Sequence, residues 1–143
     1  MGEIRTFIYC LRAEALQSQD GQAINANGVL TNITPEYVPG TFSFSIIFSI
    51  AGMSLESHML RVNFVDINGK ILVDSNDIHI PFKDVIEADK NGETLPDDEK
   101  GMIMTMDLRN VVFEKDGYYQ TRIYLDGSLK GEYKIYAKGK NRL

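Results

Sequence analysis

Residues 117–137, GYYQTRIYLDGSLKGEYKIYA, alternate regularly between apolar and polar side chains on both sides of an Asp-Gly pair. Because strand side chains point to opposite faces in turn, this pattern predicts a β-hairpin. If both apolar faces lie on the same side of the sheet, Leu125 opposes Leu129 and the loop spans residues 126–128. This register also predicts four cross-strand pairs on the outer face: Tyr118 with Tyr136, Gln120 with Lys134, Arg122 with Glu132, and Tyr124 with Lys130.

The same alternation marks further strands along the chain. Residues 4–16 and 23–33 form an expected first hairpin, with a turn at residues 18–21 and an interruption at Gly28. Residues 41–50 alternate most clearly, with Phe42, Phe44, Ile46, Phe48 and Ile50 on one face. Residues 102–108 form another expected strand, in which methionines alternate with smaller and polar side chains.

A second hairpin is centred on Asn68-Gly69, the dipeptide most typical of a two-residue type I′ turn. Such a loop pairs Phe64 with Val73. After Asp74 the apolar positions shift to residues 78, 80 and 82, so we expect a break or bulge there, with a change of sheet.

About eight short strands without a long helical period predict an all-β fold, an antiparallel two-sheet sandwich of the immunoglobulin-like or jelly-roll-like kind. A closed antiparallel barrel is the alternative. Residues 1–143 fit a single domain. Within it, residues 83–100 read as a polar acidic loop with room for a short helix, and residues 138–143 as a frayed basic tail.

Two features resemble known proteins. At residues 116–119, DGYY, the chain is similar to the tyrosine-corner entry to the sixth strand of immunoglobulin-like domains, with Tyr119 in the corner position. The order of an N-terminal strand pair, the VNFVDINGKIL hairpin and the closing GYYQTRIYLDGSLKGEY hairpin resembles a family of small uncharacterised bacterial and phage β-sandwich proteins. That resemblance implies a fold and supplies no functional residues.

Composition limits the expected binding partners and cellular location of the protein. The chain is 43% hydrophobic and has a formal net charge of -5, which disfavours binding to nucleic acid and to anionic membranes. Cys10 is the only cysteine and lies in an apolar run, so we expect a buried thiol and a reducing, cytoplasmic location. No apolar run approaches the roughly 18 residues of a membrane span.

Chemistry-bearing residues are few. His58 and His79 are the only imidazoles, and they fall on different expected strands, with Asp77 two residues before His79. Structural zinc needs about four thiolate or imidazole ligands, so the sequence predicts neither a metal site nor a cofactor. Acidic residues 97–99 could hold calcium between loops, but a charge run of this kind is more typical of a solvated loop.

The outer face of the terminal hairpin offers the one surface with a recognisable composition. It is expected to carry Tyr118, Arg122, Tyr124, Lys134 and Tyr136, and aromatic residues and arginine are enriched at protein interfaces. The leading hypothesis is therefore a non-enzymatic module that binds a protein partner or itself. The alternatives are a small-ligand or carbohydrate-binding sandwich that uses end loops around residues 83–100, and a hydrolase that uses His79 with Asp77.

Overall fold

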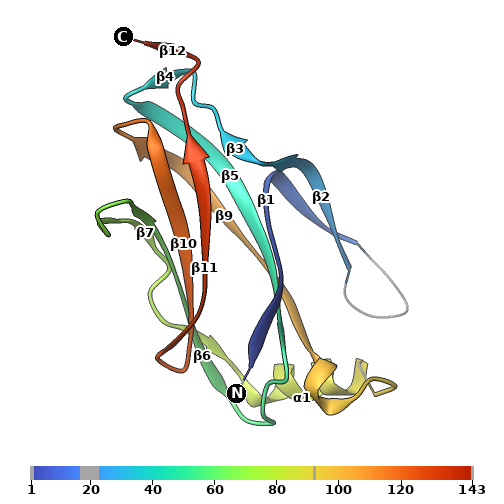
Figure 1. The fold of residues 1–143 in the computed structure, drawn as a ribbon. Coiled ribbons are helices and arrows are strands. Elements are labelled where there is room, and N and C mark those ends of the chain that lie inside the picture. The colour runs from blue at the N-terminus through green and yellow to red at the C-terminus, as the bar shows by residue number, and fades with distance from the viewer. Residues whose placement is uncertain (1, 17–22, 92, 143) are drawn as a thin grey trace.

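The computed structural model describes residues 2–16, 23–91 and 93–142, which form two β-sheets packed face to face (Figure 1). The first sheet has the strand order β2 (Ala23–Leu30), β1 (Glu3–Leu16), β5 (Gly40–Ala51) and β9 (Gly101–Phe113). The second has the order β3 (Asn32–Ile33), β11 (Ser128–Ala137), β10 (Gly117–Leu125), β6 (His58–Asp66) and β7 (Ile71–Asp74), with β8 (Ile78–Ile80) also on β6. Outside them, β4 (Tyr37–Val38) pairs with β12 (Asn141–Arg142).

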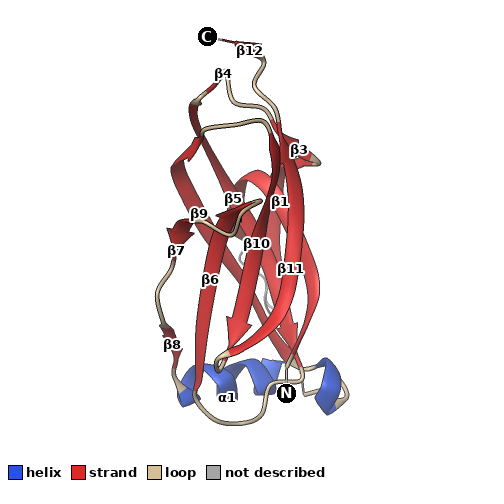
Figure 2. Ribbon diagram, turned by 60° about the vertical axis from the view of Figure 1, so that its left-hand side comes forward, coloured by secondary structure: helices blue, strands red, loops and turns tan. Residues whose placement is uncertain are grey.

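The connections between strands are those of an immunoglobulin-like sandwich. Strands β1, β5 and β9 take the places of A, B and E, and the opposite sheet β11, β10, β6 and β7 takes those of G, F, C and C′. In place of strand D, the chain between β8 and β9 forms α1 (Phe82–Asn91), which lies across one end of the sandwich (Figure 2). In the described residues no strand pairing joins the two sheets, so the barrel alternative is wrong.

The predicted alternation of β5 forms the centre of the core. The side chains of Phe44, Ile46, Phe48 and Ile50 are each at most 1% exposed. Burial of such a side chain stabilises the fold by roughly 1.5–3 kcal/mol. On the other face, the Ser45 hydroxyl is also buried and donates a hydrogen bond to Asp107 on β9, at 2.6 Å. Cys10 is a buried free thiol, as predicted.

The tyrosine corner is present at the start of β10. The Tyr119 hydroxyl donates a hydrogen bond to the backbone oxygen of Lys115, at 2.7 Å. Its ring packs in the core against Phe113 and Phe64, with ring centroids 4.8 and 5.9 Å away. The corner thus fixes the loop before β10 to the core, which agrees with the resemblance noted in the sequence.

The terminal hairpin has the predicted register only away from its turn. Tyr118 opposes Tyr136 and Arg122 opposes Glu132, as predicted, but the register shifts between Ile123 and Tyr124. The loop is the two-residue turn Asp126-Gly127, with φ of 51° and 82°, and Leu125 pairs with Ser128. The predicted three-residue loop is therefore wrong, and so is the pair of Tyr124 with Lys130, because the bulge places Leu129 opposite Tyr124. Leu129 is 47% exposed and lies outside the core.

The second hairpin shows the opposite error. Phe64 pairs with Val73 as predicted, but the register shifts immediately after that pair. The Asp66 amide donates to the backbone oxygen of Lys70, at 3.0 Å, so the loop contains the three residues 67–69. Of these three residues only Gly69 has a positive φ, of 83°, which is the geometry of a turn closed by a glycine bulge and not of a type I′ turn.

Three other expectations about the chain path need correction. The break after Asp74 is confirmed, but β8 returns to β6, so the chain does not change sheet there, and Ile78 is 40% exposed. The second expected strand continues through Gly28 and ends at Leu30, after which β3 crosses to pair in parallel with β11. The turn expected at residues 18–21 lies outside the described residues.

Residues 83–100 are mostly helical rather than a loop. After Pro81, α1 runs for ten residues with Asp84 in its first turn and Lys90 in its last, and it buries Val85 and Ala88. A short 3₁₀ turn, η1 (Asp97–Glu99), precedes β9. Within the described part of the chain, no helix is long and apolar enough to cross a membrane.

The expected frayed tail is held to the body of the protein through residue 142. Asn141 and Arg142 of β12 pair in parallel with Tyr37 and Val38 of β4. The amide of Lys140 donates to the backbone oxygen of Pro35, and that of Asn141 donates to the backbone oxygen of Glu36. These contacts join segments about a hundred residues apart, which local sequence patterns do not reveal.

Candidate functional site

The outer face of the β11–β10–β6–β7 sheet carries the predicted partner residues, with an exposed aromatic pair at one end. Tyr118 and Tyr136 are 50% and 40% exposed, and their rings meet edge to face with centroids 5.0 Å apart. The ammonium group of Lys134 lies 5.8 Å from the centre of the Tyr118 ring, within reach of a cation–π interaction. The cross-strand pairing of β10 and β11 therefore brings these three predicted residues together.

Tyr124 does not belong to that group. It lies six residues from Tyr118 along β10, which is about 20 Å in an extended strand. Arg122 lies between them, and its guanidinium is 3.5 Å from Glu132 on β11. The five predicted residues thus form a stripe along the sheet, and the two tyrosines at one end are separated from the third at the other end.

Two apolar residues extend the aromatic pair, and the sequence reading missed both. Ile67, in the β6–β7 turn, is 74% exposed, and Ile71 on β7 is 50% exposed. Ile67 and Tyr118 line a shared cavity of about 180 Å³, together with Asp66, Tyr119, Gln120 and Lys134. We call Ile67, Ile71, Tyr118, Lys134 and Tyr136 the tyrosine end. Its missed members could have been found by placing the exposed side of the second hairpin beside the first.

A polar cluster extends from Tyr124 to the middle of the face, since Arg61 on β6 pairs with Tyr124, and Asp74 on β7 pairs with the next outward-facing residue of β6, Asn63. Arg61 on β6 donates two hydrogen bonds to the carboxylate of Asp74, at 3.1 and 2.6 Å, and lies 3.8 Å from Asp77. The hydrogen bond and charge of Asp74 raise the pKa of Arg61, and the hydrogen bond from Arg61 lowers the pKa of Asp74. Both groups stay charged at neutral pH, so the middle of the face is a fixed polar network.

The predicted hydrolase pair is not assembled. His79 is exposed, as expected from its position, but the Asp77 carboxylate is directed toward Arg61. In the residues that the structure describes, His79 makes no hydrogen bond to Asp77 or to a hydroxyl group. A general base must be oriented beside the nucleophile that it activates, and this arrangement provides neither contact.

The structure instead joins His58 to Asp126, a pair that the sequence reading did not find. The His58 ring is buried, with Nδ1 2.7 Å from the Asp126 carboxylate and Nε2 2.8 Å from the backbone oxygen of Ser54. Both partners are acceptors, so the ring satisfies both only as the imidazolium ion. Burial acts to lower the pKa of His58, but the two hydrogen bonds and the charge of Asp126 outweigh it, so that pKa is raised. Because both ring nitrogens of His58 take part in hydrogen bonds, the pair stabilises the fold and the imidazole has no free nitrogen to act as a general base.

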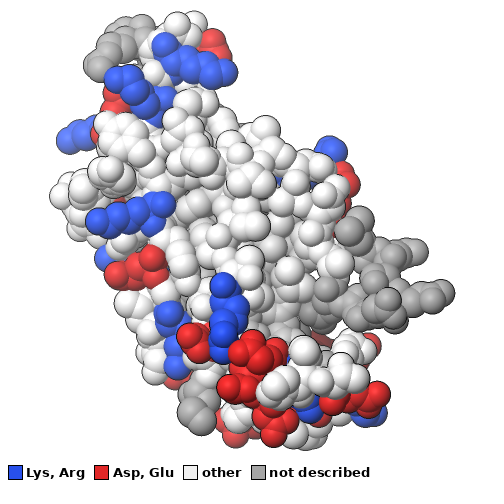
Figure 3. Space-filling model, turned by 45° about the vertical axis from the view of Figure 1, so that its right-hand side comes forward, with Lys and Arg blue, Asp and Glu red and all other residues white. Residues whose placement is uncertain are grey.

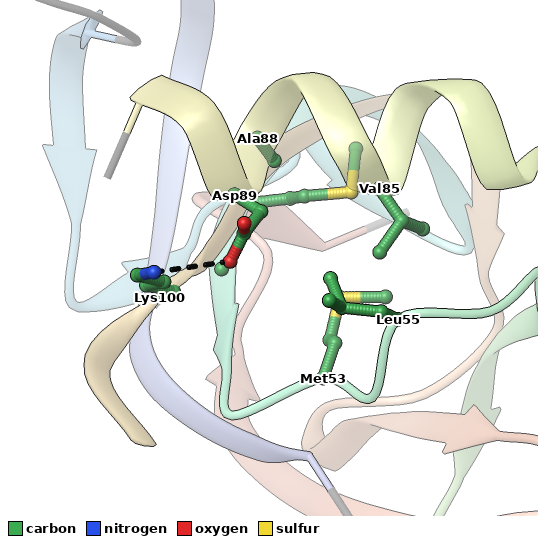
Figure 4. Close-up of a pocket in the computed structure, with 8 residues that line it drawn as sticks. Met53, Leu55, Val85, Ala88, Asp89 and Lys100 are labelled. Atoms are coloured by element: carbon green, nitrogen blue, oxygen red, sulfur yellow. Dashed lines mark ion pairs between the residues drawn. The ribbon is translucent and has the colours of Figure 1, made fainter. Parts of the chain in front are cut away.

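The α1 end of the sandwich leaves little space for a ligand. The cavity between α1 and the chain below it holds about 10 Å³, room for one water molecule, and is lined by Met53, Leu55, Val85 and Ala88 among others (Figure 4). Lys100 closes its side through an ion pair with Asp89 at 3.2 Å, and also lies 3.4 Å from Asp97. In the described segments, no three acidic, histidine or cysteine side chains gather as metal ligands.

Comparison with known proteins identifies a family for this chain. Residues 8–138 match the model of a family of unknown function, DUF6941. The chain belongs to this family. No curated protein matches the DUF6941 chain.

Three solved structures resemble the DUF6941 chain in outline. One is a Pseudomonas fluorescens alkylpurine DNA glycosylase, AlkC, bound to DNA with an abasic-site analogue, at 7% identity and a TM-score of 0.48; the match covers 96% of this chain and only 30% of the glycosylase. Another is an immunoglobulin-like protein from Pseudomonas aeruginosa, at 10% identity and a TM-score of 0.44, covering 96% and 97%. A third is a CARDB domain from Pyrococcus furiosus with two metal ions, at 9% identity and a TM-score of 0.39; the match covers 92% of this chain and 90% of that domain. At these values the resemblances carry no functional argument.

Proposed function

We propose that this DUF6941 protein is a non-enzymatic interaction module that binds a protein partner through the tyrosine end of its six-stranded sheet. The observation that carries the proposal is the exposed Tyr118–Tyr136 pair, with Ile67 beside Tyr118 and the exposed Ile71 on β7, two strands away from β10. Tyrosines pack large, rigid side chains into an interface at low conformational cost and keep a hydroxyl for hydrogen bonding.

The surroundings of the pair suit a protein surface better than a small ligand. The cavity beside Tyr118 has a volume of about 180 Å³, whereas small-molecule sites usually have about 300 Å³ or more and bury most of their ligand. Lys134, Asp66 and the Arg61–Asp74 pair supply a charged margin around the apolar residues. An apolar centre with a polar rim is the usual arrangement of a protein interface.

The proposed setting is the cytoplasm of a bacterial cell, or of one infected by a phage. The free thiol of Cys10 supports a reducing compartment. The net charge of -5 supports a protein partner over nucleic acid.

The test compares three tyrosine variants in partner recovery from the native host. A Y118S/Y136S double variant should lose the partner, because it removes both aromatic anchors, while its thermal unfolding stays close to that of the unmodified protein. Y37S is the matched control, since Tyr37 is 43% exposed but lies on β4, outside this sheet. Y124S tests the other end of the stripe and should retain the partner.

Two outcomes would contradict the proposal. Recovery that is unchanged in Y118S/Y136S would remove the tyrosine end as the binding surface. An equal loss in Y37S and Y118S/Y136S would show that recovery depends on exposed tyrosines in general and not on this pair.

A further inference from the structure

Strand β11 has an edge that is only partly covered. The short strand β3 pairs with it at Tyr136 and Ala137, and in the described residues no strand pairs with that side of β11 from Ser128 to Ile135. The amide of Lys138 donates to the backbone oxygen of Ile33 on β3, at 2.9 Å. Since backbone groups alternate along a strand, those of Glu132 and Lys134 point toward the same open side.

A groove runs beside this open edge. It has a volume of about 390 Å³ and lies between β11 on one side and β1 with β2 on the other. Glu132, Tyr133 and Lys134 line the β11 side, and Phe7, Val29 and Leu30 are among the residues opposite. Val29 is 62% exposed, so the groove offers apolar surface next to unpaired backbone groups.

Two stacked aromatic rings line the groove. The rings of Tyr133 and Phe7 stack with their centroids 4.1 Å apart and their planes within 2°. Tyr133 also folds back over Gly131, where an added Cβ would lie 2.5 Å from the Tyr133 hydroxyl oxygen. The glycine thus leaves room for the Tyr133 ring, which covers it and closes the side of the core.

Charge adds a preference for an acidic occupant. Along the open part of β11, Lys130 and Lys134 are basic and Glu132 is the one acidic residue, and Glu132 lies 3.5 Å from Arg122 on β10. Between Phe82 and Glu99 it has seven acidic residues and two basic ones. Figure 3 shows basic side chains at the end of the molecule that carries the C-terminus and acidic ones gathered at the α1 end. A strand added to β11 would meet Lys134 on its outer face, with Lys130 nearby at the bulge.

We propose that the open edge of β11 binds an extended segment of a partner protein by strand addition, with apolar side chains directed into the groove and acidic side chains beside Lys130 and Lys134. Backbone hydrogen bonds to an edge strand supply affinity in this mode, and alternate side-chain positions supply specificity. Strand β3, which already extends the same edge, shows that the edge accepts a strand in this fold. The inference goes beyond the proposed function, since it concerns the edge of the sheet and shares only Lys134 with the tyrosine end.

The test is an NMR titration of the ¹⁵N-labelled protein with a capped hexapeptide of alternating valine and glutamate. Amide signals from Ser128 to Ile135 and around Val29 should shift. A peptide with alternate amides N-methylated cannot complete the backbone ladder and should bind about tenfold more weakly. A peptide with lysine in place of glutamate should bind about fivefold more weakly at low salt.

Variants of the protein distinguish binding in the groove from binding at the tyrosine end. V29E places a charge in the groove and should weaken binding of the valine-glutamate peptide about fivefold. V112E is the matched control, since Val112 is 48% exposed on β9 and outside the groove, and it should bind normally. Y118S/Y136S should also bind the peptide normally, so the two proposals can fail independently.

Several results would overturn the inference. These are an absence of shifts at about 1 mM peptide, equal binding of the N-methylated peptide, or shifts confined to the residues around Tyr118. The β11 amide signals could instead shift with protein concentration in the absence of peptide. This result would assign the edge to a second copy of the chain and would contradict the proposal that a partner protein binds there.

Discussion

Two hairpins of the same sheet each have an aspartate that accepts hydrogen bonds at the turn, but one carboxylate bonds within its own loop and the other bonds to a different strand. Asp66 holds its own loop, since its carboxylate accepts hydrogen bonds from the amides of Asn68 and Lys70, both at 2.9 Å. Asp126 reaches another strand, where its carboxylate accepts from the Met59 amide at 2.8 Å and contacts His58 at 2.7 Å. One turn is therefore self-contained, and the other is fastened to the start of β6.

This difference indicates which turn of the sheet can change its side chains without loss of contacts to other strands. The β10–β11 turn is tied to β6 by side chain and backbone, since the Asp126 amide also donates to the Met59 backbone oxygen at 2.7 Å. The β6–β7 turn is held locally, and it exposes Ile67 beside Tyr118. Side chains at the β6–β7 turn can thus change without loss of core contacts, which suits a surface that recognises a particular partner.

Removing the two carboxylates should have unequal effects. D126A should lower the free energy of unfolding by about 3 kcal/mol, because it leaves the buried His58 ring without its carboxylate partner and places alanine at a positive φ. D66A should cost about 1 kcal/mol, since it removes only local bonds of an exposed loop. Urea unfolding of both variants measures the difference.

The control for D126A is D126N. Asparagine tolerates a positive φ and can still accept from the Met59 amide, so it isolates the loss of the negative charge beside His58. We expect a cost between those of D66A and D126A. If D66A and D126A cost the same, the contrast between a local and a long-range carboxylate is wrong.

The His58–Asp126 contact should also make stability depend on pH in two directions. The raised pKa of His58 means that its contribution is fully present below the unfolded-state pKa of about 6.5 and is lost as pH rises through the higher folded-state pKa. The hydrogen bond from His58 is the main cause of the lowered pKa of Asp126, whose contribution is present above about pH 3.9 and is lost as pH falls through the lower folded-state value.

Unfolding curves measured from pH 3 to pH 9, a range of about six units around these values, test this dependence. H58Q should flatten the alkaline side of the profile. H79Q, which removes the exposed histidine, serves as the control. An alkaline decline of equal size in H58Q would assign it to another group.

Glycine substitutions test whether the two turns differ in backbone cost as well. Gly127 and Gly69 have φ of 82° and 83°, and neither has a neighbouring atom within 4 Å of an added Cβ. G127A and G69A should therefore each cost about 1 kcal/mol, from backbone strain alone. Unequal costs would show that the hairpins differ in the turn itself and not only in their carboxylates.

Much of the fold could be predicted because its main signals are local. The alternation in β5, the pairing of Tyr118 with Tyr136 and the tyrosine corner at Tyr119 all follow from patterns within a few residues. The helix α1 also had local signals that were underused, namely Pro81 before its start and Lys90 in its last turn.

The rest could not be predicted because it depends on contacts across the chain or on single extra residues. His58 and Asp126 are 68 positions apart, and no pattern links them. In both hairpins the parity argument assumed regular strands, and one bulge in each changed the turn while the distant register stayed correct. At the candidate site, Tyr118 and Tyr136 were found from their own hairpin, whereas Ile67 required the packing of the neighbouring hairpin.

The smallest expected effect gives the clearest test of the bulge in β11. The regular register would bury Leu129 opposite Leu125, and loss of a buried leucine side chain costs about 2–5 kcal/mol. The bulge instead leaves Leu129 47% exposed, while Leu125 is 1% exposed. L129A should therefore change the free energy of unfolding by no more than about 0.5 kcal/mol. L125A is the matched control and should lower the free energy of unfolding by the full amount expected for a buried leucine. A comparable loss in L129A would contradict the bulge and support the three-residue loop.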